Sequence, residues 1–116
     1  MKIIPALLTA AVLACPVAAA QHEGVGQGGS HELHEHMLKS SEEMKTMEMS
    51  GDLDRDFVQS MLTHHRHGVE MAQIQLENGK DAKAKEFARK VVQNQKKEIK
   101  ELERWLEQHP EPGQTR

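Results

Sequence analysis

One short segment constrains the fold of this chain more than any other: the turn "NGKD" at residues 78–81. It separates two long runs, about residues 52–77 and 81–108, in which apolar side chains recur at spacings of three and four. This spacing is typical of amphipathic α-helices, and no run shows the strict alternation of a half-buried strand. The sequence therefore predicts an all-α fold built on an antiparallel two-helix hairpin over residues 51–109.

Polar and special residues mark the expected ends of these two helices. Asp52 or Asp54 should cap the first helix, and Asp81 the second, because an aspartate oxygen accepts hydrogen bonds from free N–H groups of the first turn. Gly79 suits the left-handed position that often follows a helix end. Pro110 cannot continue the second helix, which is therefore expected to end just before it.

The first twenty residues have the composition of a secretory signal peptide. Lys2 precedes an apolar run that ends in small residues, and cleavage is expected after Ala20. The only cysteine, Cys15, lies inside this segment, and a lipoprotein anchored there is the less favoured alternative. The remaining chain has no cysteine, which suits an oxidising compartment. We therefore expect a periplasmic or secreted protein.

Three flanking segments complete the expected organisation. Residues 21–30 are rich in glycine and should form a flexible linker. Residues 31–50 are rich in methionine and histidine and show helical spacing, with Ser30 as the expected N-cap. Residues 110–116 are expected to form a flexible tail.

The composition limits both the core and the partners. The chain has 7 methionines but only 2 phenylalanines, 1 tryptophan and no tyrosine, so large rigid core residues are scarce. A hairpin of about 60 residues with so few of them has a thin core, and we expect self-association into a four-helix arrangement. The formal net charge of −3 gives no support to a nucleic-acid partner.

The stretch "MLTHHRHGVEM", Met61–Met71, places three histidines between two methionines within the first hairpin helix. Met61, His64 and His65 fall on one face within a single turn, and Met71 lies two turns beyond His64. His67 lies at the edge of this face and is the weaker candidate. A core helix rarely contains three imidazoles, and a solvated helix rarely needs two thioethers.

The second hairpin helix has a polar interruption in its apolar stripe, formed by Gln95 and Glu98. With the turn centred near residues 79–80, this interruption should lie opposite the histidine cluster, and Gly68 should allow a close approach of the two helices. Gln95 and Glu98 are then expected to orient the imidazoles by accepting their second ring N–H. The expected facing pairs are His64 with Gln95, Met61 with Glu98 and Gly68 with Val91.

Imidazole nitrogen combined with thioether sulfur, without thiolate, is a ligand set that selects copper(I) and the chemically similar silver(I). Zinc would prefer cysteine or carboxylate beside histidine, and calcium and magnesium prefer oxygen. A methionine in a helical stripe is usually a core residue, and a lone buried histidine is usually hydrogen-bonded within the core. The adjacent His64 and His65 between two methionines favour the metal site.

The predicted N-terminal helix could extend metal capture, although a surface helix with adventitious affinity is an equally good interpretation of it. Its candidate ligands are Met37, Met44, Met47 and His34, with His31, His36 and Met49 as a wider set.

Residues 54–106 resemble the CopM-like family of secreted, ferritin-like helical-bundle proteins. The shared elements are Met-x-x-His-His-x(5)-Met at residues 61–71, followed by Gln95, Glu98-Ile99 and Trp105-Leu106. The resemblance implies a ferritin-like bundle and a secreted or periplasmic protein linked to copper and silver binding and tolerance, with no established catalytic activity. It carries over Met61, His64, His65 and Met71 as motif residues. Leu102 stands where methionine often occurs in the family.

Three classes of function follow, of which a copper(I)- or silver(I)-binding protein that buffers the metal or hands it to another periplasmic copper carrier is favoured. A helical interaction module is the main alternative. A ferritin-like di-iron oxidoreductase is less favoured, because it needs Glu-x-x-His pairs and the sequence has none. We therefore expect a protein that is not an enzyme.

Overall fold

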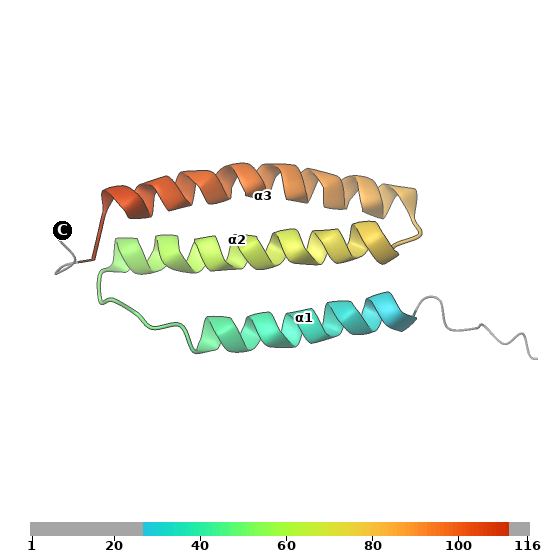
Figure 1. Cartoon of the computed structure of the whole chain (residues 1–116), viewed down its shortest axis with the longest axis horizontal. Coiled ribbons are helices and arrows are strands. Elements are labelled where there is room, and N and C mark those ends of the chain that lie inside the picture. Colours follow the sequence, from blue (N-terminus) through green and yellow to red (C-terminus); the bar gives the residue numbers. More distant parts are fainter. Residues whose placement is uncertain (1–26, 112–116) are drawn as a thin grey trace, which may run out of the picture.

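The computed structural model describes residues 27–111 and contains three α-helices, α1 (Gln27–Lys45), α2 (Leu53–Asn78) and α3 (Ala82–Gln108). They lie side by side with α2 in the middle (Figure 1); α2 packs on both neighbours, while α1 and α3 make no close backbone contact. No strand occurs between residues 27 and 111. The predicted all-α fold, a hairpin of two long helices with a shorter helix before it, is confirmed.

Three predicted segments lie largely outside this range. The expected signal peptide falls on residues 1–20, and only residues 27–30 of the expected linker and 110–111 of the expected tail are described. None of the helices in the described part of the chain combines the length and hydrophobicity needed to cross a membrane.

Aspartate side chains begin both helices of the hairpin, as predicted. Asp52 is the N-cap of α2, and its Oδ1 accepts hydrogen bonds from the backbone N–H of Asp54 at 3.0 Å and of Arg55 at 3.2 Å. Asp81 caps α3 by accepting a 2.7 Å hydrogen bond from the backbone N–H of Ala84. These caps satisfy N–H groups that have no partner within the helix.

The glycine that ends α2 differs from expectation. Gly79 has φ −69° and ψ 151°, an extended conformation, so the predicted left-handed geometry is wrong. A Cβ at this position would lie 2.5 Å from the carbonyl oxygen of Gln75, so glycine is required here for space. The positive φ, 89°, belongs instead to Gly51, in the connector between α1 and α2.

The N-terminal helix begins and ends earlier than predicted. Because α1 starts at Gln27, Ser30 lies inside the helix and is not its N-cap, and residues 27–30 are helical. Gly29 packs so tightly against Asn78 that a Cβ would collide with that side chain. Asn78 also donates a 3.1 Å hydrogen bond to the Glu32 carboxylate. These contacts with the end of α2 stabilise a start that the local sequence does not favour.

The hydrophobic core lies mainly in the seam between α2 and α3. The buried apolar side chains are Val58, Leu62, Val69, Ala72 and Ala88. Within the described range no large side chain is completely buried, so the core is thin, as the composition indicates.

The register of the hairpin differs by about one turn from the expected one. Nε2 of His65 lies 2.6 Å from Oε2 of Glu98, and Gly68 abuts the side chain of Gln95. The reason is that Cα–Cβ bonds point toward the N-terminus of their own helix, so side chains of α2 lean away from the turn while those of α3 lean toward it. The expectation that a histidine faces the polar part of the second helix is nevertheless confirmed. The expected pairs that this shift overturns are His64 with Gln95, Met61 with Glu98 and Gly68 with Val91.

Candidate metal centre

An apolar groove of about 800 Å³ runs over one face of the three helices. Its floor includes Gly68 and Ala72 of α2, and Phe87 and Val91 of α3 form part of one wall. Five of the residues that the sequence singled out as metal ligands line this groove. They are Met37 and Met44 from α1, and His64, His67 and Met71 from α2.

Helical spacing explains why these side chains converge. Met37 and Met44 are seven residues apart, which is close to two full turns, so both lie on the same face of α1. His64 and Met71 have the same separation on α2. Because α2 lies between the other two helices, this face of α2 is left without a helix covering it. The groove therefore brings soft side chains of α1 and α2 to one surface.

The structure does not bring the remaining candidates into this groove. Met61 is half-buried but is not part of the described lining, and His34 is exposed on α1. Met47 lies in the connector, where its sulfur is 3.5 Å from Oγ of Ser60. His65 points into the seam with α3.

His65 is a buried seam residue with one close partner. Its Nε2 contacts Glu98 at 2.6 Å, the length of a strong charge-assisted hydrogen bond. Its Nδ1 and the Oε1 of Gln95 are both buried without a hydrogen-bond partner. Glu98 thus contacts an imidazole as predicted, whereas Gln95 packs over Gly68 and is not hydrogen-bonded to one.

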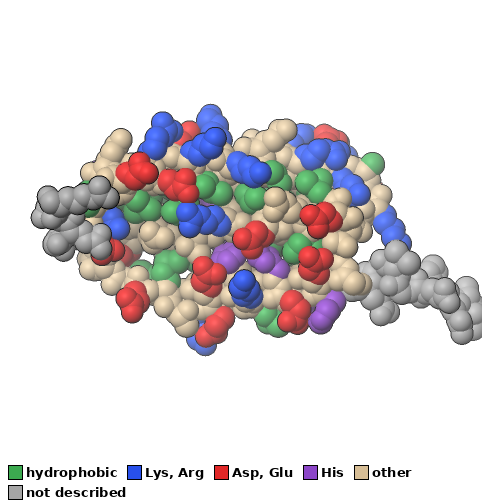
Figure 2. Space-filling model, viewed as in Figure 1, with side chains coloured by type: hydrophobic (Ala, Val, Ile, Leu, Met, Phe, Trp, Pro, Cys, Tyr) green, Lys and Arg blue, Asp and Glu red, His purple; other side chains and the backbone are tan. Residues whose placement is uncertain are grey.

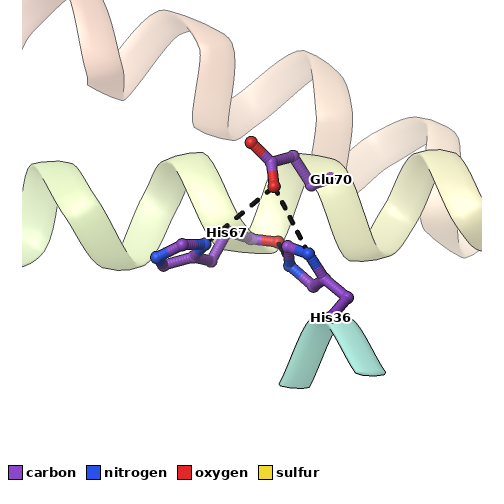
Figure 3. A group of neighbouring side chains, drawn as sticks. All are labelled: His36, His67 and Glu70. Carbon is purple, nitrogen blue, oxygen red and sulfur yellow. Dashed lines mark hydrogen bonds and ion pairs between the residues drawn. The ribbon is translucent and has the colours of Figure 1, made fainter. Parts of the chain in front are cut away.

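A second group of ligand atoms lies between α1 and α2 (Figure 3). Nδ1 of His36 is 3.3 Å from Oε2 of Glu70, and Nδ1 of His67 is 4.0 Å from the same oxygen. One ligand atom from each of the three residues lies within 4.8 Å of the others, so the group could hold a metal ion. Both imidazoles are shielded, with side-chain exposures of 11% and 13%.

One hydrogen bond orients the ring of His36 from behind, and an ion-pair contact lies behind the ring of His67, which has no hydrogen-bond partner. Nε2 of His36 lies 3.2 Å from the backbone carbonyl oxygen of His67. Nε2 of His67 lies 3.3 Å from Oε2 of Glu43, a carboxylate of α1. His67, which the sequence left at the edge of the apolar face, therefore faces α1 and also lines the groove.

Sequence reasoning included His36 only in the wider set of N-terminal candidates, and it missed Glu43 and Glu70. One local signal was present: His67 and Glu70 are three residues apart and thus share a face of α2. The contribution of His36 depends on how α1 docks against α2, which no local pattern specifies.

Between residues 27 and 111, the fold and side chains define three packed α-helices with a His/Glu group that could hold a metal ion. The chain belongs to the protein family described as a domain of unknown function (DUF305), which matches residues 3–106. No curated protein and no solved structure matches the chain. The family is thus established, and the narrower resemblance to CopM-like proteins stays a prediction.

Proposed function

We propose that this protein binds copper(I), or the chemically similar silver(I), with methionine sulfur and histidine nitrogen in the apolar groove. The observation that carries the proposal is the lining of this groove by Met37, Met44 and Met71 together with His64 and His67. Thioether and imidazole ligands favour soft monovalent copper over magnesium, calcium or manganese. A groove lined mainly by carbon also offers few oxygen ligands to hard ions.

The groove is suited to a metal that is exchanged. In the single chain Met37 is 49% exposed and Met71 is 36% exposed, so a carrier could reach their sulfur atoms whenever no second copy covers the groove. Methionine sulfur has a further advantage in an oxidising compartment, since it does not form disulfides as cysteine does. We infer a periplasmic or secreted protein that buffers copper, confers tolerance or hands the metal to another copper carrier.

The proposal assigns binding and no catalytic step. A ferritin-like di-iron oxidoreductase is disfavoured because the sequence contains no Glu-x-x-His pair. A helical interaction module is the stronger alternative, because the groove is apolar and Phe87 on its wall is 71% exposed. A copper(I)-binding protein needs the methionine sulfur and histidine nitrogen atoms of the groove, whereas an interaction module needs only its apolar surface.

Self-association would complete a ferritin-like, four-helix type of arrangement. The open groove lies between α1 and α3, which make no close backbone contact, so it occupies the place of a missing helix. A second copy of the chain could cover it with its own apolar face. Sedimentation is expected to show a dimer, and a compact, stable monomer would contradict this part of the proposal.

Competition for copper(I) against a chelator, under anaerobic conditions, tests the metal assignment. Replacing Met37 and Met71 together by leucine keeps the volume and hydrophobicity but removes both sulfur atoms. We expect the copper(I) affinity to fall at least tenfold. The matched control is Met49→Leu, an exposed methionine of the connector, which should bind like the wild type.

The same variants separate metal binding from an interaction module. A ligand that binds only the folded state must raise the melting temperature, so copper(I) should stabilise the wild type and the Met49→Leu variant more than the double variant. If copper(I) affinity and melting shift are the same in all three proteins, the groove is not a copper site.

A further inference from the structure

We propose that His36, His67 and Glu70 bind a borderline divalent cation, of the class of zinc(II) or copper(II), and that this ion ties α1 to α2. The site differs from the copper(I) groove in its ligand atoms and in the kind of ion. His36 and Glu70 are not part of the described groove lining, and His67 alone belongs to both.

The hydrogen bond behind His36 decides which ring nitrogen faces the site. A backbone carbonyl oxygen can only accept, so Nε2 of His36 must donate to the carbonyl of His67. In the neutral ring Nδ1 then carries a lone pair, and it points at the carboxylate of Glu70, which is 3.3 Å away. Two acceptors that face each other in this way repel unless a proton or a metal ion lies between them.

Distances within the same molecule leave room for a metal ion in place of a proton. The pair His65–Glu98 is separated by 2.6 Å, as expected when a proton is shared in a hydrogen bond. His36 and His67 stand 3.3 Å and 4.0 Å from Glu70. Ligands placed tetrahedrally around a zinc ion, each about 2.1 Å from it, are separated by about 3.4 Å.

The second imidazole repeats the pattern of the first. Nδ1 of His67 faces Glu70, while its Nε2 faces the carboxylate of Glu43 at 3.3 Å. A metal-binding histidine usually donates its other ring N–H to a carboxylate or a backbone carbonyl, which fixes the ring and its tautomer. His36 has such a hydrogen bond, whereas Glu43 stands only at ion-pair distance from His67, whose two ring nitrogens are buried without a hydrogen-bond partner. Nδ1 of both rings can therefore bind a common ion.

The electrostatic surroundings favour a cation. A polar hollow of about 510 Å³ next to the site is lined by His36 and Glu70 together with three further carboxylates and one lysine. The carboxylates are those of Glu32, Glu35 and Glu77, and the lysine is Lys39. Figure 2 shows histidine side chains between α1 and α2 with acidic side chains around them. This excess of negative charge attracts cations toward the two imidazoles.

The ligand atoms select the class of ion. Two imidazole nitrogens and one carboxylate oxygen suit zinc(II) and copper(II). Copper(I) would be better served by sulfur, and calcium or magnesium by oxygen alone. Because His36 belongs to α1 and the other two ligands to α2, the bound ion would join the two helices.

Zinc(II) titration of the metal-free full-length protein, read by a competing chromogenic chelator, tests this proposal. The wild type should bind one zinc(II) at the site, and His36→Gln and Glu70→Gln should each weaken this binding at least tenfold. Glu43→Gln should weaken it by less than about tenfold, because Glu43 contacts His67 as an ion pair and not through a hydrogen bond that would orient the ring. Glu70 is 55% exposed, so its replacement by the isosteric amide should not prevent folding.

The matched control is His34→Gln, an exposed histidine two residues from His36 on the same helix, which should leave zinc(II) binding unchanged. Electron paramagnetic resonance of bound copper(II) supplies an independent readout, since the wild type should show two imidazole nitrogens and His36→Gln only one. Zinc(II) affinity that is equal in the wild type and Glu70→Gln, or that falls as much in His34→Gln as in His36→Gln, would overturn the proposal. Copper(I) binding in the groove should persist in Glu70→Gln, so failure of the two sites can be distinguished.

Discussion

The two seams of the central helix α2 are built from different chemistry. Toward α3 the seam is mainly apolar, with Leu62 and Val69 buried. Two short polar contacts cross it, a half-shielded one between His65 and Glu98 and an exposed one between Arg66 and Glu103. Toward α1 the seam has a polar centre, where imidazoles and carboxylates stand at separations of 3.3 Å and more. The hairpin thus has a core of its own, whereas the seam with α1 contains imidazoles and carboxylates that could hold a metal ion.

This difference bears directly on the groove. Met37 and Met44 reach the groove from α1, while His64 and Met71 reach it from α2. The methionines of the two helices therefore meet only when α1 is docked. A cation in the seam between α1 and α2 would strengthen that docking and so help to assemble the soft-metal groove beside it.

The largest expected effect comes from the apolar seam. Leu62, only 4% exposed, lies in the seam between α2 and α3. Leu62→Ala should lower the free energy of unfolding by roughly 2–5 kcal/mol, since it removes transfer energy and leaves a cavity. Urea unfolding followed by helical circular dichroism measures this loss.

The control for this prediction is a leucine of α1. Leu38 of α1 is exposed, so Leu38→Ala should change the free energy of unfolding by no more than about 0.5 kcal/mol. Equal losses in the two variants would show that the hairpin is not the stable part of the molecule.

A smaller effect compares the two histidine–carboxylate contacts. Glu98→Gln should destabilise the protein by about 1 kcal/mol, because it removes the charge from a short hydrogen bond to a buried imidazole. Glu70→Gln should change stability by less than about 0.5 kcal/mol when divalent ions have been removed, because its contacts to imidazole nitrogen are longer.

Thermal unfolding with and without zinc(II) measures both variants. Zinc(II) should raise the melting temperature of Glu98→Gln as it does in the wild type, and should raise that of Glu70→Gln less at the same zinc(II) concentration. If Glu70→Gln lost more stability than Glu98→Gln in metal-free buffer, the proposed difference between the two seams would be wrong.

The smallest effect concerns the connector that joins α1 to the hairpin. The carboxylate of Asp56 accepts hydrogen bonds from the hydroxyl and the backbone N–H of Ser50 and from the N–H of Gly51. These bonds, led by that of the Ser50 hydroxyl, lower the pKa of Asp56 below its ordinary value of 3.8. A lowered carboxyl pKa stabilises the fold above the ordinary value and loses this contribution as the pH falls through the lowered one.

Asp56→Asn should therefore be less stable than the wild type near neutral pH, with the difference shrinking once the pH drops below the ordinary aspartate value. Melting temperatures measured across this acidic range test the sign. A difference that grows on acidification would show that Asp56 does not act through its ionised carboxylate.

Local chemistry made much of the fold predictable. The period of the apolar residues located α2 and α3, and Asp52 and Asp81 marked their starts because capping depends only on the next three residues. The register was wrong by about one turn because counting along the backbone ignores the lean of side chains. The start of α1 was wrong because Gly29 and its neighbours are helical through contact with Asn78, a partner distant in sequence.

The candidate sites divide in the same way. Periodicity placed His64 and Met71 on one face of α2, and both residues do line the groove. The groove by itself does not show which ligand binds there. It could not foresee that Met61 would lie outside the groove lining, nor that His36 would meet Glu70, because both facts depend on how three helices pack. The metal identity, the export signal and the copper role stay predictions.

The most direct test of the copper(I)/silver(I) groove is a crystal soaked with silver(I), located by its anomalous scattering. The account predicts a silver ion in the groove within bonding distance of sulfur from Met37, Met44 or Met71, together with nitrogen from His64 or His67. Silver bound only at exposed histidines such as His34, with none in the groove, would contradict it.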